Sequence, residues 1–259
     1  MASLQITNLE SQIPAELLIA HIMQLHASIS KLDSLRPSKQ RSRLCAESLI
    51  NLCGRAEGLL ELEFSTLLGK TFQPLNNLNL FPYYGNYVLL ANLENKILND
   101  NGVVHPNKVA FIGSGPMPLT SIVMATHHMK STHFDNFDID DKANEVARRI
   151  VASDAELEKR MKFETRDIMK VRERLAEYDC IFLAALVGMN KEDKVKILGH
   201  IRKHMKEGSV LLVRSAKGAR AFLYPVIEEH DLLGFELLTI FHPNNEVINS
   251  VVLVRKPIF

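Results

Sequence analysis

The chain has 259 residues, of which 46% are hydrophobic and 24% charged, a composition typical of a folded globular protein. Lys and Arg total 31 against 30 for Asp and Glu, and this near-neutral balance does not favour nucleic acid or an anionic membrane as a partner. The three cysteines show no zinc-binding spacing, and neither a leader sequence nor an apolar run of bilayer length is evident, so a cytoplasmic protein is expected.

Residues 1–104 are predicted to form a helical region that covers the active site of the domain after it. Apolar residues recur at three- and four-residue spacing over 17–29 and 44–64, which is typical of amphipathic helices. Pro37 lies in a polar break between the two, because proline disfavours helical backbone before it. A loop rich in Asn and Pro then precedes a further helix over 87–99.

From 105 to 259, short apolar runs alternate with helical patterns, which predicts one domain built on a mostly parallel sheet. Strands are expected at 109–112, 134–139, 161–165, 180–185, 210–214, 236–241 and 250–255. Helices are expected at 119–128, 142–152, 191–204 and 218–226. The predicted fold class is therefore α/β, with a seven-stranded sheet preceded by an N-terminal α-helical region.

A glycine-rich turn follows the first predicted strand and precedes a helix, with the sequence Gly113-Ser114-Gly115-Pro116. Glycine lets the backbone turn sharply there and approach a ligand where a Cβ would clash. The same residues also fit an ordinary βα turn. Because Pro118 stands where a dinucleotide-binding motif has its third glycine, a bound pyrophosphate is not favoured.

Acidic residues follow the next two strands. Asp138 ends the second strand, about 20 residues further on, where such folds bind ribose hydroxyls. Asp140 is the expected N-cap of the next helix. Alternatively, both acids serve only as helix caps. Asp167 follows the third strand, where an acid in this architecture usually meets the adenine amino group. Ala184 and Leu186 belong to the fourth strand end and its loop, beneath the ligand. This order and spacing predict S-adenosylmethionine binding on a Rossmann-like transferase fold.

Several long segments resemble plant nicotianamine synthases, and the likeness covers essentially all of residues 49–256 and the opening helix. The matching segments are 52–58 (LCGRAEG), 81–87 (FPYYGNY), 111–121 (FIGSGPMPLTS), 136–140 (NFDID), 182–189 (FLAALVGM) and 220–225 (RAFLYP). Three features depart from the family pattern: Arg55 replaces an acid, Gly85 replaces a serine, and the link around residues 39–41 is shortened. The shortened link keeps a non-catalytic paralogue open as an alternative.

The resemblance implies a transferase that condenses three molecules of S-adenosylmethionine into nicotianamine. Each step moves an aminocarboxypropyl group and releases one methylthioadenosine, and an intramolecular attack closes an azetidine ring. A sulfonium activates all three attached carbons, so binding geometry must select the methionyl Cγ, and the attacking amine must be neutral. No metal or cofactor beyond S-adenosylmethionine, the substrate, is expected, and a homo-oligomer is left open.

Two residues are predicted to be catalytic. Glu57 is the candidate that binds or deprotonates the attacking amine, with Tyr83 orienting the substrate. Glu61 is the alternative acid, because residues i and i+4 share a helix face. Tyr84 and Arg214 are predicted to bind substrate, the guanidinium by pairing with a carboxylate.

Each of these residues could instead have a structural role. The acids could be solvated, the tyrosines could belong to the core, and the arginine could form a surface salt bridge. Arg220 is a second candidate for a substrate carboxylate, and Tyr87 for a core or sheet-covering aromatic. His242, before Pro243, is interpreted as a turn or packing residue. The alternative enzyme class is a small-molecule methyltransferase, which would use the same glycine turn and acids and release S-adenosylhomocysteine.

Overall fold

The computed structural model describes residues 39–258, so the helix expected over 17–29 lies outside the described residues. The strands are β1 (Lys108–Ile112), β2 (His133–Asp138), β3 (Met161–Thr165), β4 (Cys180–Leu183), β5 (Val210–Ser215), β6 (Glu236–Phe241) and β7 (Ser250–Arg255). They form one sheet in the order β3-β2-β1-β4-β5-β7-β6. β7 runs antiparallel to the other six strands, which confirms the mostly parallel sheet within the described chain.

Helices cover both faces and one edge of this sheet. They are α2 (Lys39–Leu68), α3 (Tyr84–Asp100), α4 (Leu119–Val123), α5 (Asp141–Val151), α6 (Ala155–Arg160) and α7 (Lys191–His204). α4 continues directly into a π-helical turn at Met124–His128. No helix among the described residues is both long and apolar enough to cross a bilayer.

One predicted helix is absent from the described structure, and one helix in it was not predicted. The segment 218–226 forms only a 3₁₀ turn at Gly218–Phe222, because Pro225 lacks an amide proton and disfavours helical backbone before it. α6 was not predicted, since Leu157 is its single buried residue and gives no periodic pattern. Its start is fixed instead by Asp154, whose carboxylate accepts hydrogen bonds from two backbone amides of the first turn.

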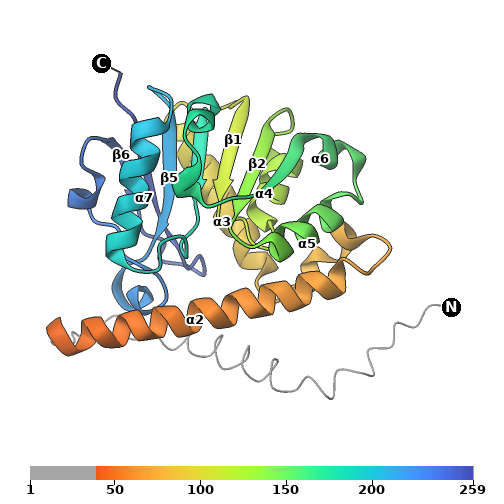
Figure 1. The fold of residues 1–259 in the computed structure, drawn as a ribbon, viewed down its shortest axis with the longest axis horizontal. Helices are drawn as coiled ribbons and strands as arrows, with labels where there is room; N and C mark the ends of the chain where they lie inside the picture. The colour runs from red at the N-terminus through yellow and green to blue at the C-terminus, as the bar shows by residue number, and fades with distance from the viewer. Residues whose placement is uncertain (1–38, 259) are drawn as a thin grey trace.

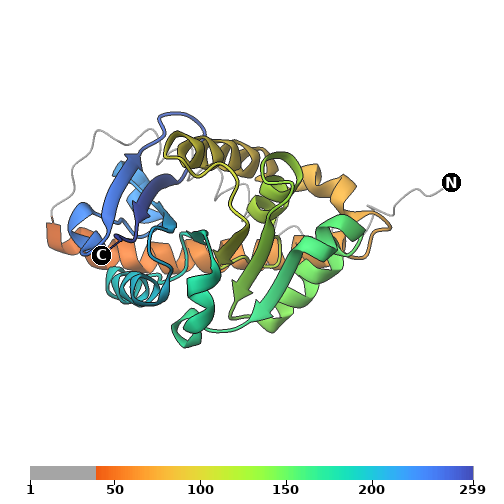
Figure 2. The same ribbon diagram turned by 90° about the horizontal axis from the view of Figure 1, so that it is seen from above.

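The core forms two layers because strand side chains alternate between the faces of the sheet. Val109 and Phe111 of β1 pack with residues of α3, α4 and α5, whereas Ala110 and Ile112 pack with those of α7. Figure 2 shows α3 and α7 on opposite sides of the sheet. All four of these β1 side chains are at most 5% exposed, as expected for a strand in the middle of a parallel sheet.

α2 is a single long helix that lies across the carboxyl ends of the parallel strands (Figure 1). The contact is close: a Cβ on Gly54 would lie 2.9 Å from Cε of Met189, in the loop after β4. Residues of α2 therefore meet the loops that follow the parallel strands, which is where ligands bind in open α/β sheets. The boundary between residues 104 and 105 stays a prediction.

Candidate active site

The glycine turn after β1 has the backbone geometry that the sequence predicted. Gly113 and Gly115 have φ angles of +79° and +66°, which disfavour other residues. A Cβ on Gly113 would lie 2.2 Å from Cγ2 of Val187, in the loop after β4. The close approach of that loop therefore also requires glycine at position 113. The Gly115 amide donates a 2.9 Å hydrogen bond to Oδ2 of Asp138, which ties the turn to the end of β2.

An outer cavity of about 1200 Å³ opens beside this turn. Its lining includes the predicted binding residues Gly113, Gly115, Pro116, Asp138, Asp167, Ala184 and Leu186. Asp140 accepts a hydrogen bond from the Lys142 amide, which confirms its N-cap role. The Asp167 carboxylate accepts one from the Met169 amide. Apolar Ile139 and Met169 line the same space beside the acids, a combination that suits a ribose and a purine.

A smaller inner cavity of about 100 Å³ adjoins the outer one. The two share the lining residues Gly58, Glu61, Gly113, Ala184 and Leu186. Ser114, which was predicted to bind the same ligand, lines the inner cavity and is 7% exposed. Further walls come from α2, α3, β1, β5 and the two segments after β5 and β6. The inner cavity is therefore assembled from parts of the chain far apart in sequence.

Two acids on one face of α2 line the inner cavity, and each is paired with a tyrosine. The hydroxyl of Tyr224 donates to both carboxylate oxygens of Glu57, at 3.3 and 3.2 Å. The hydroxyl of Tyr87 donates to Oε1 of Glu61 at 2.8 Å. The i, i+4 spacing that made Glu61 the alternative acid thus brings both carboxyls into the same cavity.

The environment of these acids favours their protonated forms. Burial raises the pKa of Glu57 to about 7, although the Tyr224 hydrogen bond and the charge of Arg214 oppose the shift. Burial and the nearby Glu57 carboxyl raise the pKa of Glu61 to about 8. Two carboxyls that titrate near neutral pH can each accept and return a proton, as acid–base catalysis requires.

Arg214 lines the inner cavity, and most of its N–H groups donate hydrogen bonds to other side chains of the protein. Its Nε and Nη2 donate to the two carboxylate oxygens of Glu94, at 2.7 and 3.0 Å, and Nη2 also donates to Thr120 at 2.6 Å. Its guanidinium lies over the Phe111 ring, 5.3 Å from the centroid. The bidentate pairing expected with a substrate carboxylate is thus made with Glu94, which leaves Nη1 as the nitrogen without a hydrogen bond in the described structure.

Tyr83, which was predicted to orient the substrate, lies close to Glu57 but is not part of the lining of either cavity. Burial, the Glu57 carboxyl and the Cys53 thiol together raise the pKa of Tyr83 to about 12. Its ring packs edge-on against Phe81, with centroids 5.8 Å apart. Tyr84 is partly buried against the hydrophobic core and is not part of the lining of either cavity.

The two remaining candidates have structural contacts. Arg220 donates to the backbone carbonyls of Pro243, Asn245 and Val247, and so holds the loop between β6 and β7. His242, which was interpreted as a turn or packing residue, is exposed and contacts the Ser250 hydroxyl through Nδ1 at 2.9 Å.

Sequence reasoning missed four residues at the site. Tyr224 belongs to a motif that was recognised, and Glu94 could have been noticed as the acid within an apolar helix pattern. Lys194 and Asn249 gave no signal. The Lys194 side chain is fully buried, and its ammonium donates to the carbonyls of Ala184 and Ala185, the wall between the cavities. Burial lowers the pKa of Lys194 to about 7, and the charge of Arg214 adds to this shift.

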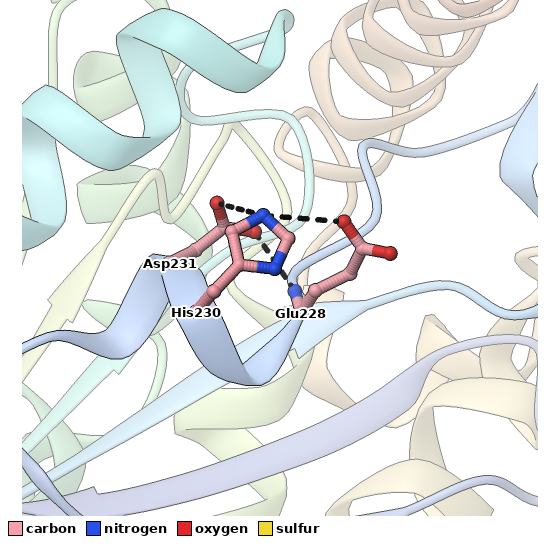
Figure 3. Close-up of side chains that lie close together, drawn as sticks. All are labelled: Glu228, His230 and Asp231. Carbon is pink, nitrogen blue, oxygen red and sulfur yellow. Dashed lines mark hydrogen bonds and ion pairs between the residues drawn. The ribbon is translucent and has the colours of Figure 1, made fainter.

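A cluster of metal-binding residue types in the described chain lies outside both cavities, at Glu228, His230 and Asp231 (Figure 3). Glu228 and Asp231 form a capping box at the start of a short 3₁₀ turn. The Lys191 ammonium lies 2.6 Å from Glu228 and 3.2 Å from Asp231. The carboxylates therefore already have a local cation and a structural role.

Comparisons with known proteins agree with this geometry. Residues 42–259 match the family model described as nicotianamine synthase protein. Nicotianamine synthase 3 of Arabidopsis thaliana is 50% identical over 93% of this chain and 84% of its own length. Nicotianamine synthase of Solanum lycopersicum is 48% identical over 92% of this chain and 83% of its own length.

The fold is also found among solved structures. A variant of MtNAS in complex with S-adenosylmethionine superposes with a TM-score of 0.73 at 21% identity, covering 94% of this chain and 95% of that one. This likeness shows a shared Rossmann-like fold, and the sequence matches show descent. The chain belongs to the nicotianamine synthase family.

Proposed function

We propose that this chain condenses three molecules of S-adenosylmethionine into nicotianamine, with Glu57 and Glu61 as the acid–base groups. The observation that carries the proposal is the pair of carboxyls in an inner cavity that adjoins an outer cavity with ample room for a nucleoside. The kinship to curated nicotianamine synthases over most of the chain supports the reaction.

The two cavities suit the two ends of the substrate. Adenosine fits the outer cavity, where the Asp138 and Asp167 carboxylates can accept hydrogen bonds from ribose hydroxyls and the adenine amino group. The aminocarboxypropyl chain then passes the wall of Gly113, Ala184 and Leu186 into the inner cavity. In this proposed pose Cγ, rather than the methyl group, lies beside the acids, which favours aminocarboxypropyl transfer.

Three N–Cγ bonds form, two by transfer to an acceptor and the last by ring closure within one chain, and each releases one methylthioadenosine and one proton. The neutral amine of the acceptor attacks Cγ, the N–Cγ bond forms, the Cγ–S bond breaks, and methylthioadenosine leaves with the bonding electron pair. The proton lost by nitrogen passes to a carboxylate of the Glu57–Glu61 pair, whose raised pKa values make it an effective base near neutral pH. Tyr224 and Tyr87 hold the two carboxyls in place.

The test is incubation of the purified protein with S-adenosylmethionine alone, followed by mass spectrometry of the small molecules. Methylthioadenosine and nicotianamine in a three-to-one ratio are expected. S-adenosylhomocysteine as the product would instead show a methyltransferase. Bound but unchanged S-adenosylmethionine would show a non-catalytic paralogue.

A further inference from the structure

The inner cavity contains a buried polar side chain that the mechanism above does not use. Asn249 lines the cavity and is 8% exposed, and its Nδ2 has no hydrogen-bond partner among the described residues. A buried amide without a partner is costly, and such groups are rare in folded proteins unless a ligand or water completes them. This side chain therefore indicates a ligand in the inner cavity.

Asn249 and Arg214 line the same small cavity, at adjoining ends of β7 and β5. Arg214 of β5 is paired with Val251 of β7, and Ser215 with Ser250. Asn249 is the residue directly before β7, so this pairing brings it close to the end of β5 that carries Arg214. Both polar side chains line the inner cavity, so the amide and the guanidinium offer neighbouring hydrogen-bond donors there.

The donors and acids come from different walls of the inner cavity. Arg214 belongs to β5 and Asn249 directly precedes β7, and Nη1 of Arg214 is the nitrogen that Glu94 and Thr120 do not engage. Glu57 and Glu61 belong to α2, which crosses the edge of the sheet (Figure 1). A cavity with donors on one wall and carboxyls on another is complementary to an α-amino acid group, which carries a carboxylate and an amine on one carbon.

We propose that Asn249, with Nη1 of Arg214, binds the carboxylate of an aminocarboxypropyl chain, whose amine then faces Glu57 and Glu61. This inference rests on the proposed function for the identity of the chain. The carboxylate has two sources, S-adenosylmethionine as donor and the acceptor molecule. Fixing the carboxylate orients the chain, so Asn249 acts as a substrate-binding residue that the sequence motifs do not include.

The experiment compares two unreactive ligands by titration calorimetry. S-adenosylhomocysteine carries the aminocarboxypropyl chain, and methylthioadenosine lacks it. The variants are Asn249→Ala and Asn249→Asp, and the matched control is Asn244→Ala, an exposed residue of the same loop. Methylthioadenosine affinity reports whether each variant keeps a folded adenosine site. Steady-state KM for S-adenosylmethionine is measured on the same samples.

Asn249→Ala is expected to weaken S-adenosylhomocysteine binding about tenfold, the effect of one hydrogen bond to a charged group. Asn249→Asp should weaken it further, because its carboxylate repels that of the ligand. Methylthioadenosine affinity should stay unchanged in both variants. If the carboxylate belongs to the acceptor, S-adenosylhomocysteine affinity also stays unchanged, but the KM for S-adenosylmethionine rises in both variants.

Two results would overturn the inference. One is an equal loss of affinity for both ligands, which would show that the substitution disturbs the adenosine site. The other is no change in either affinity or in KM. Failure of the proposed function is a separate result: a wild-type protein without turnover, whose Asn249 variants still lose S-adenosylhomocysteine selectively, would refute the reaction and keep the carboxylate site.

Discussion

The outer and inner cavities lie side by side at the same edge of the sheet, but they are built in different ways. The outer cavity is formed largely by loops that directly follow β1, β2, β3 and β4, together with α2. The inner cavity combines residues as distant as Glu57, Tyr87 and Asn249. A binding site made by consecutive strand ends can be recognised from local motifs, whereas a reaction chamber made by distant side chains depends on packing across the whole fold.

The largest expected effect separates the two cavities by activity. Glu57→Gln removes a proton acceptor from the inner cavity but leaves the outer one intact, so kcat should fall by roughly 10²–10⁴-fold. Methylthioadenosine affinity, measured by calorimetry, should not change. Glu63→Gln is the control, because Glu63 is exposed on the same helix. A Glu57→Gln enzyme with activity close to that of the wild type would remove this residue from the mechanism.

The next effect concerns the stability of the inner cavity. Glu94→Ala leaves the buried Arg214 guanidinium without its carboxylate partner, and breaking such a pair costs about 3–5 kcal/mol. Urea unfolding should show this loss in the free energy of unfolding. Lys96→Ala, which removes an exposed ion pair with Asp100 on the same helix, should change it by less than about 1 kcal/mol. Similar values for the two variants would contradict a structural role for the buried pair.

A third substitution tests the outer cavity. Gly113→Ala forces a non-glycine residue to a φ of +79°, at a cost of about 1–3 kcal/mol, and pushes its Cβ against Val187. Both stability and methylthioadenosine affinity should fall. Gly199→Ala in α7, where a Cβ meets open space, should be neutral or slightly stabilising. Unchanged methylthioadenosine binding in Gly113→Ala would show that the turn does not shape the adenosine site.

The smallest effect is a pH dependence of stability. The pKa of Glu61 rises from 4.5 to about 8 on folding, so its contribution is fully present below pH 4.5 and is lost as the pH rises through 8. The melting temperature of Glu61→Gln relative to wild type should therefore increase between about pH 5 and about pH 9, by only a few degrees because the Glu61 side chain is half-buried and water screens its charge. Lys194 has a lowered pKa and acts in the opposite direction at higher pH, but it is present in both proteins and cancels in the difference.

The control for this measurement is again Glu63→Gln, whose difference from wild type should stay constant with pH. A constant difference for Glu61→Gln as well would mean that the native carboxyl titrates as it does in the unfolded chain. In that case the inner cavity would be more hydrated than its lining residues indicate.

The sequence alone determined the sheet, the glycine turn and the acids of the outer cavity. These features are local: an apolar run forms a strand, glycine permits a positive φ after it, and an acid ends the next strand. Long motifs also pointed to the family and to Glu57 and Glu61, since i, i+4 spacing on a helix is a local property. The failed prediction at 218–226 shows the limit of this reasoning, because Pro225 broke a pattern that looked helical.

Only the tertiary structure decided which side chains meet in the inner cavity. In the folded protein Tyr224 is hydrogen-bonded to Glu57, Tyr87 to Glu61 and Arg214 to Glu94. Asn249 lines the same cavity as the guanidinium. No local pattern encodes such pairings, because they arise when helices dock on a sheet and buried polar groups must find partners. The position of a charge along the chain is readable, but its partner depends on the fold.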